Sequence, residues 1–242
     1  MAFAPRFLVW ASLLAPLAAM AQSNWTNPGT GDWYTPGNWS AGVPGAGVDA
    51  VIENGGTAVL SSGSGAAHHL EISGGSAFLV SDGADLGLAR LLVGYGSNGS
   101  MLVTGLGTEV TISPELVASL LIGTNALGTL TIDDGAVVRT LFADGDRVSL
   151  GSMSGGTGTL LLNATGANRG VLATNMISHE GGALIFNGGI LRAIGNQGNV
   201  LQNFEEGTII INSGGAYIDT DGFQIGIQAP MGGAGGLSKI GE

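Results

Sequence analysis

Cysteine is absent from this chain, and positive charge is scarce. The sequence contains no cysteine, six arginines and a single lysine, Lys239. The absence of cysteine excludes disulfide scaffolds and thiolate metal sites, and it suits an exported protein that crosses a membrane unfolded. With a net charge of −11, the chain lacks the clustered basic side chains that contact phosphates, so the sequence predicts no nucleic-acid partner.

Long helix-forming runs are also scarce, and no apolar stretch after residue 21 approaches the length of a membrane helix. Only 10% of the residues are charged, and the mean hydropathy of +0.37 is too high for a disordered chain. Apolar residues come instead in bursts of three to five, closed by Gly, Asn, Asp or Ser. This pattern indicates many short strands and therefore an all-β fold.

The stretch Ala89–Thr174 contains three copies of one sequence pattern. In each copy, a short apolar run ends in glycine, a polar turn follows, and a second run begins with glycine. The anchor glycines lie at 94, 123 and 151 for the first run and at 99, 128 and 158 for the second. A fixed period of about 29 residues predicts a stacked repeat architecture.

Each repeat contains about three short strands. Those expected in the three repeats are Leu91–Val93, Met101–Thr104 and Glu109–Ile112, then Leu120–Ile122, Thr129–Ile132 and Val137–Arg139, then Val148–Leu150, Thr159–Leu162 and Val171–Ala173. An earlier unit is expected at Thr57–Leu60, His69–Ser73 and Ala77–Ser81. Later units are expected at Ala183–Phe186 with Ile190–Arg192, and at Thr208–Asn212, Ala216–Ile218 and Phe223–Ile227.

Three strands per period predict that one repeat makes one coil of a solenoid. Coils stack at the inter-strand spacing of about 4.8 Å, so that each strand pairs with its counterparts above and below. We therefore expect a right-handed parallel β-helix over residues 57–242, with about one coil per 29-residue repeat. A β-sandwich would show strict alternation and regular hairpins, and a propeller would have a longer, four-stranded repeat.

Residues 1–21 have the pattern of a signal peptide. Arg6 gives a positive start, Phe7–Leu17 is apolar, and Ala19-Met20-Ala21 is a small-x-small cleavage signature, which places the cut before Gln22. A membrane anchor is the alternative, but the apolar run is short and Pro16 interrupts it. The mature chain is accordingly expected to be exported.

Residues 22–56 are predicted to form an irregular, tryptophan-rich N-terminal cap. This segment holds Trp25, Trp33 and Trp39, three of the four tryptophans. The first coil of a solenoid has an apolar end that must be covered, and aromatic side chains bury a large area each. The alternative is that the three indoles form a platform on which sugars stack.

Three features carry a resemblance to a known family. They are the opening Gly31-Asp32-Trp33 with Gly37-Asn38-Trp39-Ser40-Ala41-Gly42-Val43-Pro44, the repeats with Ile/Val-Gly and Gly-Thr-Leu-Thr-Ile, and the close Gly232-Gly233-Ala234-Gly235-Gly236-Leu237-Ser238-Lys239-Ile240-Gly241. In this order they resemble the N-terminal passenger region of bacterial type V autotransporters. The middle resembles a repeat shared with PEP-CTERM-type exported proteins, and the close resembles the start of the autotransporter-associated strand repeat.

The resemblance implies a non-catalytic, adhesin-like passenger or stalk. Such a protein is displayed at the cell surface or outer membrane of a Gram-negative bacterium, or released outside it, and its partner is a host surface or a glycan. The family also implies an outer-membrane barrel at the C-terminus of the full-length protein. No such segment is recognisable before Glu242, so the chain is expected to be a fragment.

Motifs for cofactor binding and nucleophilic catalysis receive little support. The run from Gly94 to Gly99 matches GxGxxG, but the residues after it are strand-like, and the motif requires a helix there. No Gly-x-Ser-x-Gly occurs. Of the three histidines, His68 and His69 are adjacent on a strand, so their rings are expected on opposite sides, and His179 stands apart. We therefore expect no cofactor and no metal site.

Paired carboxylates are the remaining candidates, because polysaccharide-cleaving β-helices use such pairs as acid and base. The pairs are Asp133/Asp134, Asp144/Asp146 and Asp219/Asp221. The first two pairs are predicted to lie in turns, and the third is predicted to share one strand face. We expect solvated turn residues and no catalytic site; the alternatives are a polysaccharide-acting enzyme and a carbohydrate-binding protein.

Overall fold

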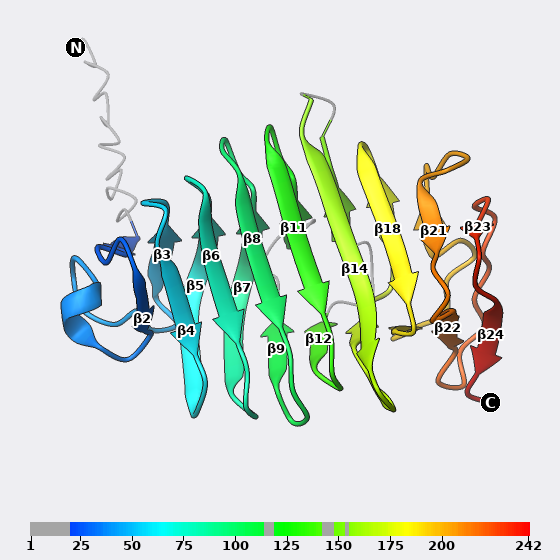
Figure 1. Cartoon of the computed structure of the whole chain (residues 1–242), viewed down its shortest axis with the longest axis horizontal. Coiled ribbons are helices and arrows are strands. Elements are labelled where there is room, and N and C mark those ends of the chain that lie inside the picture. Colours follow the sequence, from blue (N-terminus) through cyan, green and yellow to red (C-terminus); the bar gives the residue numbers. More distant parts are fainter. Residues whose placement is uncertain (1–19, 114–118, 142–147, 153–154) are drawn as a thin grey trace, which may run out of the picture.

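The computed structural model describes residues 20–113, 119–141, 148–152 and 155–242 of the 242-residue chain. This part of the chain contains 24 β-strands, one short 3₁₀ helix, η1 (Pro36–Asn38), and no α-helix. None of its helical segments is long and apolar enough to cross a membrane. The strands stack along one long axis as a solenoid, and the ladders between them are parallel except where β14 meets β15 (Figure 1).

Each coil passes over three faces, which we number in the order in which the chain visits them. The second face is the near sheet of Figure 1, and its strands follow one another in sequence order along the axis. They are β2 (Thr30–Asp32), β4 (Thr57–Leu60), β6 (Ser76–Val80), β8 (Gly99–Val103), β11 (Leu127–Ile132), β14 (Thr157–Thr165), β18 (Gly182–Asn187), β21 (Ile209–Ile211) and β23 (Gly232–Gly233). β15 (Asn168–Arg169) pairs antiparallel with the end of β14.

The first and third faces belong to a second sheet. The first face comprises β1 (Ala21–Asn24), β3 (Val48–Ile52), the C-terminal halves of β5 (Ser64–Ile72) and β7 (Asp85–Val93), β10 (Leu120–Ile122), β13 (Val148–Leu150), β17 (Ile177–His179) and β20 (Leu201–Gln202). The third face comprises the N-terminal halves of β5 and β7, β9 (Glu109–Ile112), β12 (Val137–Thr140), β16 (Val171–Ala173), β19 (Ile190–Arg192), β22 (Ala216–Asp219) and β24 (Leu237–Ile240).

The solenoid is right-handed. In Figure 1 the chain advances from left to right, the strands of the near face run downward, and the return passes behind. This confirms the predicted right-handed parallel β-helix, and the handedness agrees with the strong preference of parallel crossovers.

The period evident in the sequence holds in the middle of the solenoid, whereas the two coils from Ala50 to Leu70 and from Leu70 to Leu91 are shorter. Leu91 pairs with Leu120, and Leu120 with Val148, so these coils repeat the spacing of the anchor glycines. Leu70 pairs with Leu91, which makes that coil clearly shorter than the two that follow it. The shorter coil has no loop between the third and first faces, because β5 and β7 each run continuously round that corner.

Inward-facing side chains of successive coils lie on one another and form a continuous core. On the first face, Leu91, Leu120, Val148 and Ile177 are in register and fully buried. Each such side chain contributes about 1.5–3 kcal/mol of burial free energy, but only when a coil covers it on both sides. The stability of each coil therefore depends on its neighbours.

The anchor glycines found in the sequence mark one corner of every middle coil. Gly94, Gly123 and Gly151 have positive φ angles of 77°, 80° and 76°. The second glycines, at 99, 128 and 158, begin or lie early in the strands of the second face, where the backbone of the preceding coil is close. Both sets are thus explained by the tight passage from the first to the second face.

The N-terminal segment buries its three tryptophans against the first coils of the core. Trp25, Trp33 and Trp39 are 2%, 0% and 4% exposed. The Trp39 ring meets the other two edge-on, with centroids 5.1 and 4.9 Å away, and its Nε1 donates to the Trp33 carbonyl oxygen. A sugar platform needs exposed ring faces, so that alternative is wrong for these three indoles.

Several predicted boundaries differ from the observed ones. The cap contributes strands to the solenoid, since β2 pairs with β4 and β3 pairs with β5 across the expected border at residue 57. The expected strand Phe223–Ile227 is wrong, because only Ile225 makes an isolated bridge, to Gln197. Residues 1–19 of the expected signal peptide lie outside the described residues, and the expected cleavage position falls within β1.

Candidate functional site

A polar cavity of about 250 Å³ lies on the outer side of the first face, over the first coils. Its polar and aromatic lining comes from four neighbouring segments: Gln22, Asp49, His69, Glu71, Arg90 and Tyr95. Along each strand every second side chain points outward, and parallel register lines up these outward positions between coils. Gln22 pairs with Asp49, and His69 pairs with Arg90, so the cavity is built from side chains that stack across coils.

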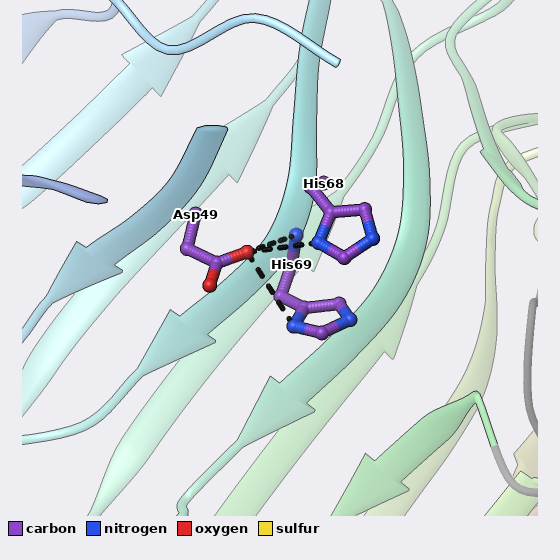
Figure 2. A group of neighbouring side chains, drawn as sticks. All are labelled: Asp49, His68 and His69. Carbon is purple, nitrogen blue, oxygen red and sulfur yellow. Dashed lines mark hydrogen bonds and ion pairs between the residues drawn. The ribbon is translucent and has the colours of Figure 1, made fainter. Parts of the chain in front are cut away.

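Asp49 and His69 of the cavity lining also form a cluster with His68. Figure 2 shows both imidazole rings directed at the Asp49 carboxylate. The Nδ1 atoms of His68 and His69 lie 3.0 and 3.4 Å from Asp49 Oδ1, and the His69 backbone N–H donates to the same oxygen over 3.2 Å. A carboxylate oxygen only accepts hydrogen bonds, so the ring nitrogens that approach it are donors when Asp49 is ionised.

The two histidine rings lie on the same side of the chain, and the expectation of opposite sides is wrong. Their centroids are only 4.0 Å apart, with an interplanar angle of 30°. The reason is the corner in β5, where the alternation of buried and less buried side chains is interrupted, because the consecutive residues Ala67 and His68 are both buried. The pairing of β5 with β7 also skips His68, so the strict alternation that separates neighbouring side chains does not operate there.

Glu71 and Arg90 supply the other charges of the cavity. Burial raises the pKa of the Glu71 carboxyl, a hydrogen bond from Ser73 lowers it, and repulsion from Glu53 adds to the rise. The Nε of Arg90 is buried and makes no hydrogen bond within the described part of the chain. The cavity therefore combines two carboxylates, one guanidinium and one imidazole on a half-buried surface.

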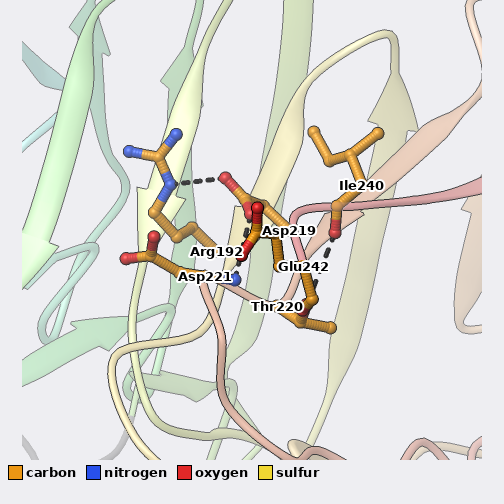
Figure 3. A network of polar contacts seen from close by, with 6 residues as sticks. All are labelled: Arg192, Asp219, Thr220, Asp221, Ile240 and Glu242. Atoms are coloured by element: carbon orange, nitrogen blue, oxygen red, sulfur yellow. Dashed lines mark hydrogen bonds and ion pairs between the residues drawn. The ribbon is translucent and has the colours of Figure 1, made fainter.

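The Asp219/Asp221 pair does not share a strand face, which corrects the prediction. β22 ends at Asp219, and Asp221 follows in a turn with a positive φ of 47°. Figure 3 shows Asp219 held by Arg192, whose Nε lies 2.7 Å from Asp219 Oδ2, while Asp219 Oδ1 accepts the backbone N–H of Asp221. Both carboxylate oxygens of Asp219 are thus engaged, one by the Arg192 guanidinium and one by the turn that follows the strand.

The other carboxylate candidates are turn residues or lie outside the described chain. Asp133 accepts hydrogen bonds from Thr165 Oγ1 and from the Asp134 backbone, and Asp134 accepts one from Asn168. The turn predicted for this pair is confirmed, with a positive φ of 47° at Asp134. Asp144 and Asp146 fall among residues 142–147, which the structure does not describe.

The remaining motif and histidine have structural roles. Strand β8 begins at Gly99, so the helix that a dinucleotide fingerprint requires is replaced by a strand, as expected. His179 lies at the end of β17, where its ring is 5.0 Å from that of Phe204 and its Nε2 lies 3.1 Å from the Gly182 carbonyl oxygen. His179 does not line the cavity, whereas Tyr95, which lies within the Gly94–Gly99 run, does.

Sequence reasoning missed the grouping of Asp49 with His68 and His69. These residues come from β3 and β5, and only the stacking of two coils brings them together. The signal that could have revealed it is the shorter coil at this end of the solenoid, where Ala50 pairs with Leu70. Comparison with protein families, with curated proteins and with solved structures found no match for this chain.

Proposed function

We propose that this chain is a non-catalytic passenger or stalk segment, exported to the surface of a Gram-negative bacterium and adhesin-like in role. The observation that carries the proposal is the continuous sheet of the second face, on which nine strands of the described chain follow one another in sequence order. A stack of this kind forms an extended rod and does not enclose an active-site cleft. The family resemblance of the opening, the repeats and the close supports export.

Extension follows directly from the stacking. At about 4.8 Å per coil, nine strands span about 40 Å, and each further coil adds the same increment. Because every coil is stabilised mainly by its neighbours, repeats can be added without redesign of a central core. Exposed strand faces along such a rod offer repeated contact positions for a host surface or a glycan.

Export is tested by expressing the full chain in a Gram-negative host and fractionating the cells. We expect an exported form whose N-terminal residue is Gln22, because signal peptidase prefers small residues at the two recognition positions. The variant Ala21→Lys, which places a charge at the cleavage position, is expected to remain unprocessed. Recovery of the wild-type chain in the cytoplasm with its leader intact would contradict the proposal.

A carbohydrate-acting protein is the second candidate, and one observation favours it. The cavity on the first face contains the carboxylates of Asp49 and Glu71 beside the exposed ring of Tyr95, and carboxylates with an aromatic side chain are typical of glycan sites. Incubation of the purified chain with plant and microbial glycans is expected to release no oligosaccharide. Reproducible release that Glu71→Gln abolishes and Asp133→Asn does not would favour this candidate over the stalk.

A further inference from the structure

We propose that Asp49, His68 and His69 bind one divalent transition-metal ion, with Zn²⁺ as the best-suited probe. Two imidazole nitrogens and one carboxylate oxygen are offered from two successive coils, and all three ligand atoms lie within 4.8 Å of one another. This proposal is independent of the stalk role, since it concerns what the first coils bind.

The two distances from the Asp49 carboxylate oxygen to the imidazole nitrogens match those between ligands of a tetrahedral ion. Zinc lies about 2.0–2.1 Å from its nitrogen and oxygen ligands, which places neighbouring ligand atoms about 3.3 Å apart. Asp49 Oδ1 is 3.0 Å from His68 Nδ1 and 3.4 Å from His69 Nδ1. An ion would take the place of the two Nδ1 protons, each neutral ring would carry its proton on Nε2, and small side-chain rotations would complete the site.

The ligand types favour one class of ion. Imidazole suits zinc, copper, nickel and cobalt, whereas calcium and magnesium require sites built mainly from oxygen atoms. The charges lining the adjoining cavity also favour a cation, since Asp49 and Glu71 oppose the single guanidinium of Arg90. The side chains of His69 and Asp49 are 31% and 27% exposed, which leaves a path for the ion and room for a water ligand.

Binding has a structural consequence at the N-terminal end of the solenoid. Asp49 lies on β3 and both histidines on β5, so the ion cross-links two neighbouring coils. Terminal coils have a neighbour on one side only and unfold more readily than internal ones. A bound ion stabilises the folded form in proportion to its affinity, and this stabilisation is expected mainly in the first coils.

The test uses the untagged, chelator-treated full chain, because a polyhistidine tag would itself bind the metal. Zinc is titrated by calorimetry, and cobalt is followed by its visible absorption, whose intensity distinguishes tetrahedral from octahedral coordination. We expect one ion per chain and strong visible absorption. Hydrogen exchange should slow in β3 and β5 on zinc addition and remain unchanged in β21 and β22.

Two variants and one control identify the ligands. Asp49→Asn keeps the size and an acceptor for the ring N–H groups, and His69→Gln removes one imidazole; each should weaken zinc binding more than 100-fold, since loss of a mere hydrogen-bonding partner of a ligand already costs about 10–100-fold. His179→Gln, a histidine outside the cluster, should leave binding unchanged. Circular dichroism establishes that each variant is folded. No zinc uptake by the folded wild-type chain, or equal affinity in all three variants, would overturn the proposal.

Discussion

Replacement of Gly128 by alanine is expected to destabilise the solenoid strongly, because the new methyl group would occupy an inter-coil hydrogen bond. A Cβ at this position would lie 2.1 Å from the Val93 carbonyl oxygen and 2.3 Å from the Gly123 nitrogen. These two atoms form the 2.7 Å hydrogen bond that joins the coil to the preceding one. Both are backbone atoms, so no side-chain rotation relieves the clash.

The expected cost combines two effects. Moving the coil by about 1 Å to make room resembles overpacking of a core, which costs about 1–3 kcal/mol. Weakening one buried backbone hydrogen bond adds about 0.5–1.5 kcal/mol. We therefore expect Gly128→Ala to lower the free energy of unfolding by about 1.5–4.5 kcal/mol.

Gly87→Ala is the matched control. Gly87 lies on the outer side of β7, and an added Cβ there meets no atom within 4 Å. Alanine should be neutral at this position, or should stabilise the fold by up to about 1 kcal/mol through a less flexible unfolded chain.

Urea unfolding followed by far-ultraviolet circular dichroism measures both variants against the wild type. The reasoning predicts a lower midpoint for Gly128→Ala, and a similar loss for Gly158→Ala, whose Cβ would lie 2.1 Å from the Ile122 carbonyl oxygen. If Gly128→Ala and Gly87→Ala unfolded at the same urea concentration, the close approach of successive coils at this corner would be refuted.

Three further variants test the cap, the cavity and the C-terminal ion pair. Trp39→Ala should cost about 3–5 kcal/mol and unfold the first coils before the rest, as seen by hydrogen exchange; a uniform loss would contradict the cap role. Glu71→Gln should raise the urea midpoint at pH 7. Burial raises the pKa of the Glu71 carboxyl above the ordinary 4.5, so the wild-type chain loses stability as pH rises from 4.5 through the raised pKa. The gain in the variant should vanish well below pH 4.5, and its persistence there would argue against a charge effect. Asp219→Ala should cost about 1.5–3 kcal/mol by leaving Arg192 without its carboxylate, and an unchanged midpoint would show that solvent replaces the pair.

Much of the fold was predictable because the same tight corner recurs in every middle coil and requires glycine at the same positions. The distances between Gly94, Gly123 and Gly151 gave the coil length directly, and the structure pairs their coils with the same offsets. The prediction of a strand at Phe223–Ile227 was wrong for a related reason. Its apolar residues suit a strand, but only Ile225 finds a bridging partner, and a strand requires a neighbour along its length.

The candidate site was less predictable, because its residues come from coils of unequal length. Asp49 and His69 lie next to each other only through a coil that is shorter than the period evident in the sequence. Asp219 and Asp221 show the converse. Their spacing suggested one face, but the strand ends between them and a positive φ angle turns the second carboxylate away.

The sequence alone determined the class of architecture: short apolar runs between glycine-anchored turns can bury their side chains only by stacking on copies of themselves. Which outward side chains meet follows from the folded arrangement of the coils. That outcome depends on the register between coils and on the corner in β5, where the alternation breaks and brings both histidines to Asp49. Local sequence fixes the direction of a side chain along a strand, but packing between coils fixes its neighbours.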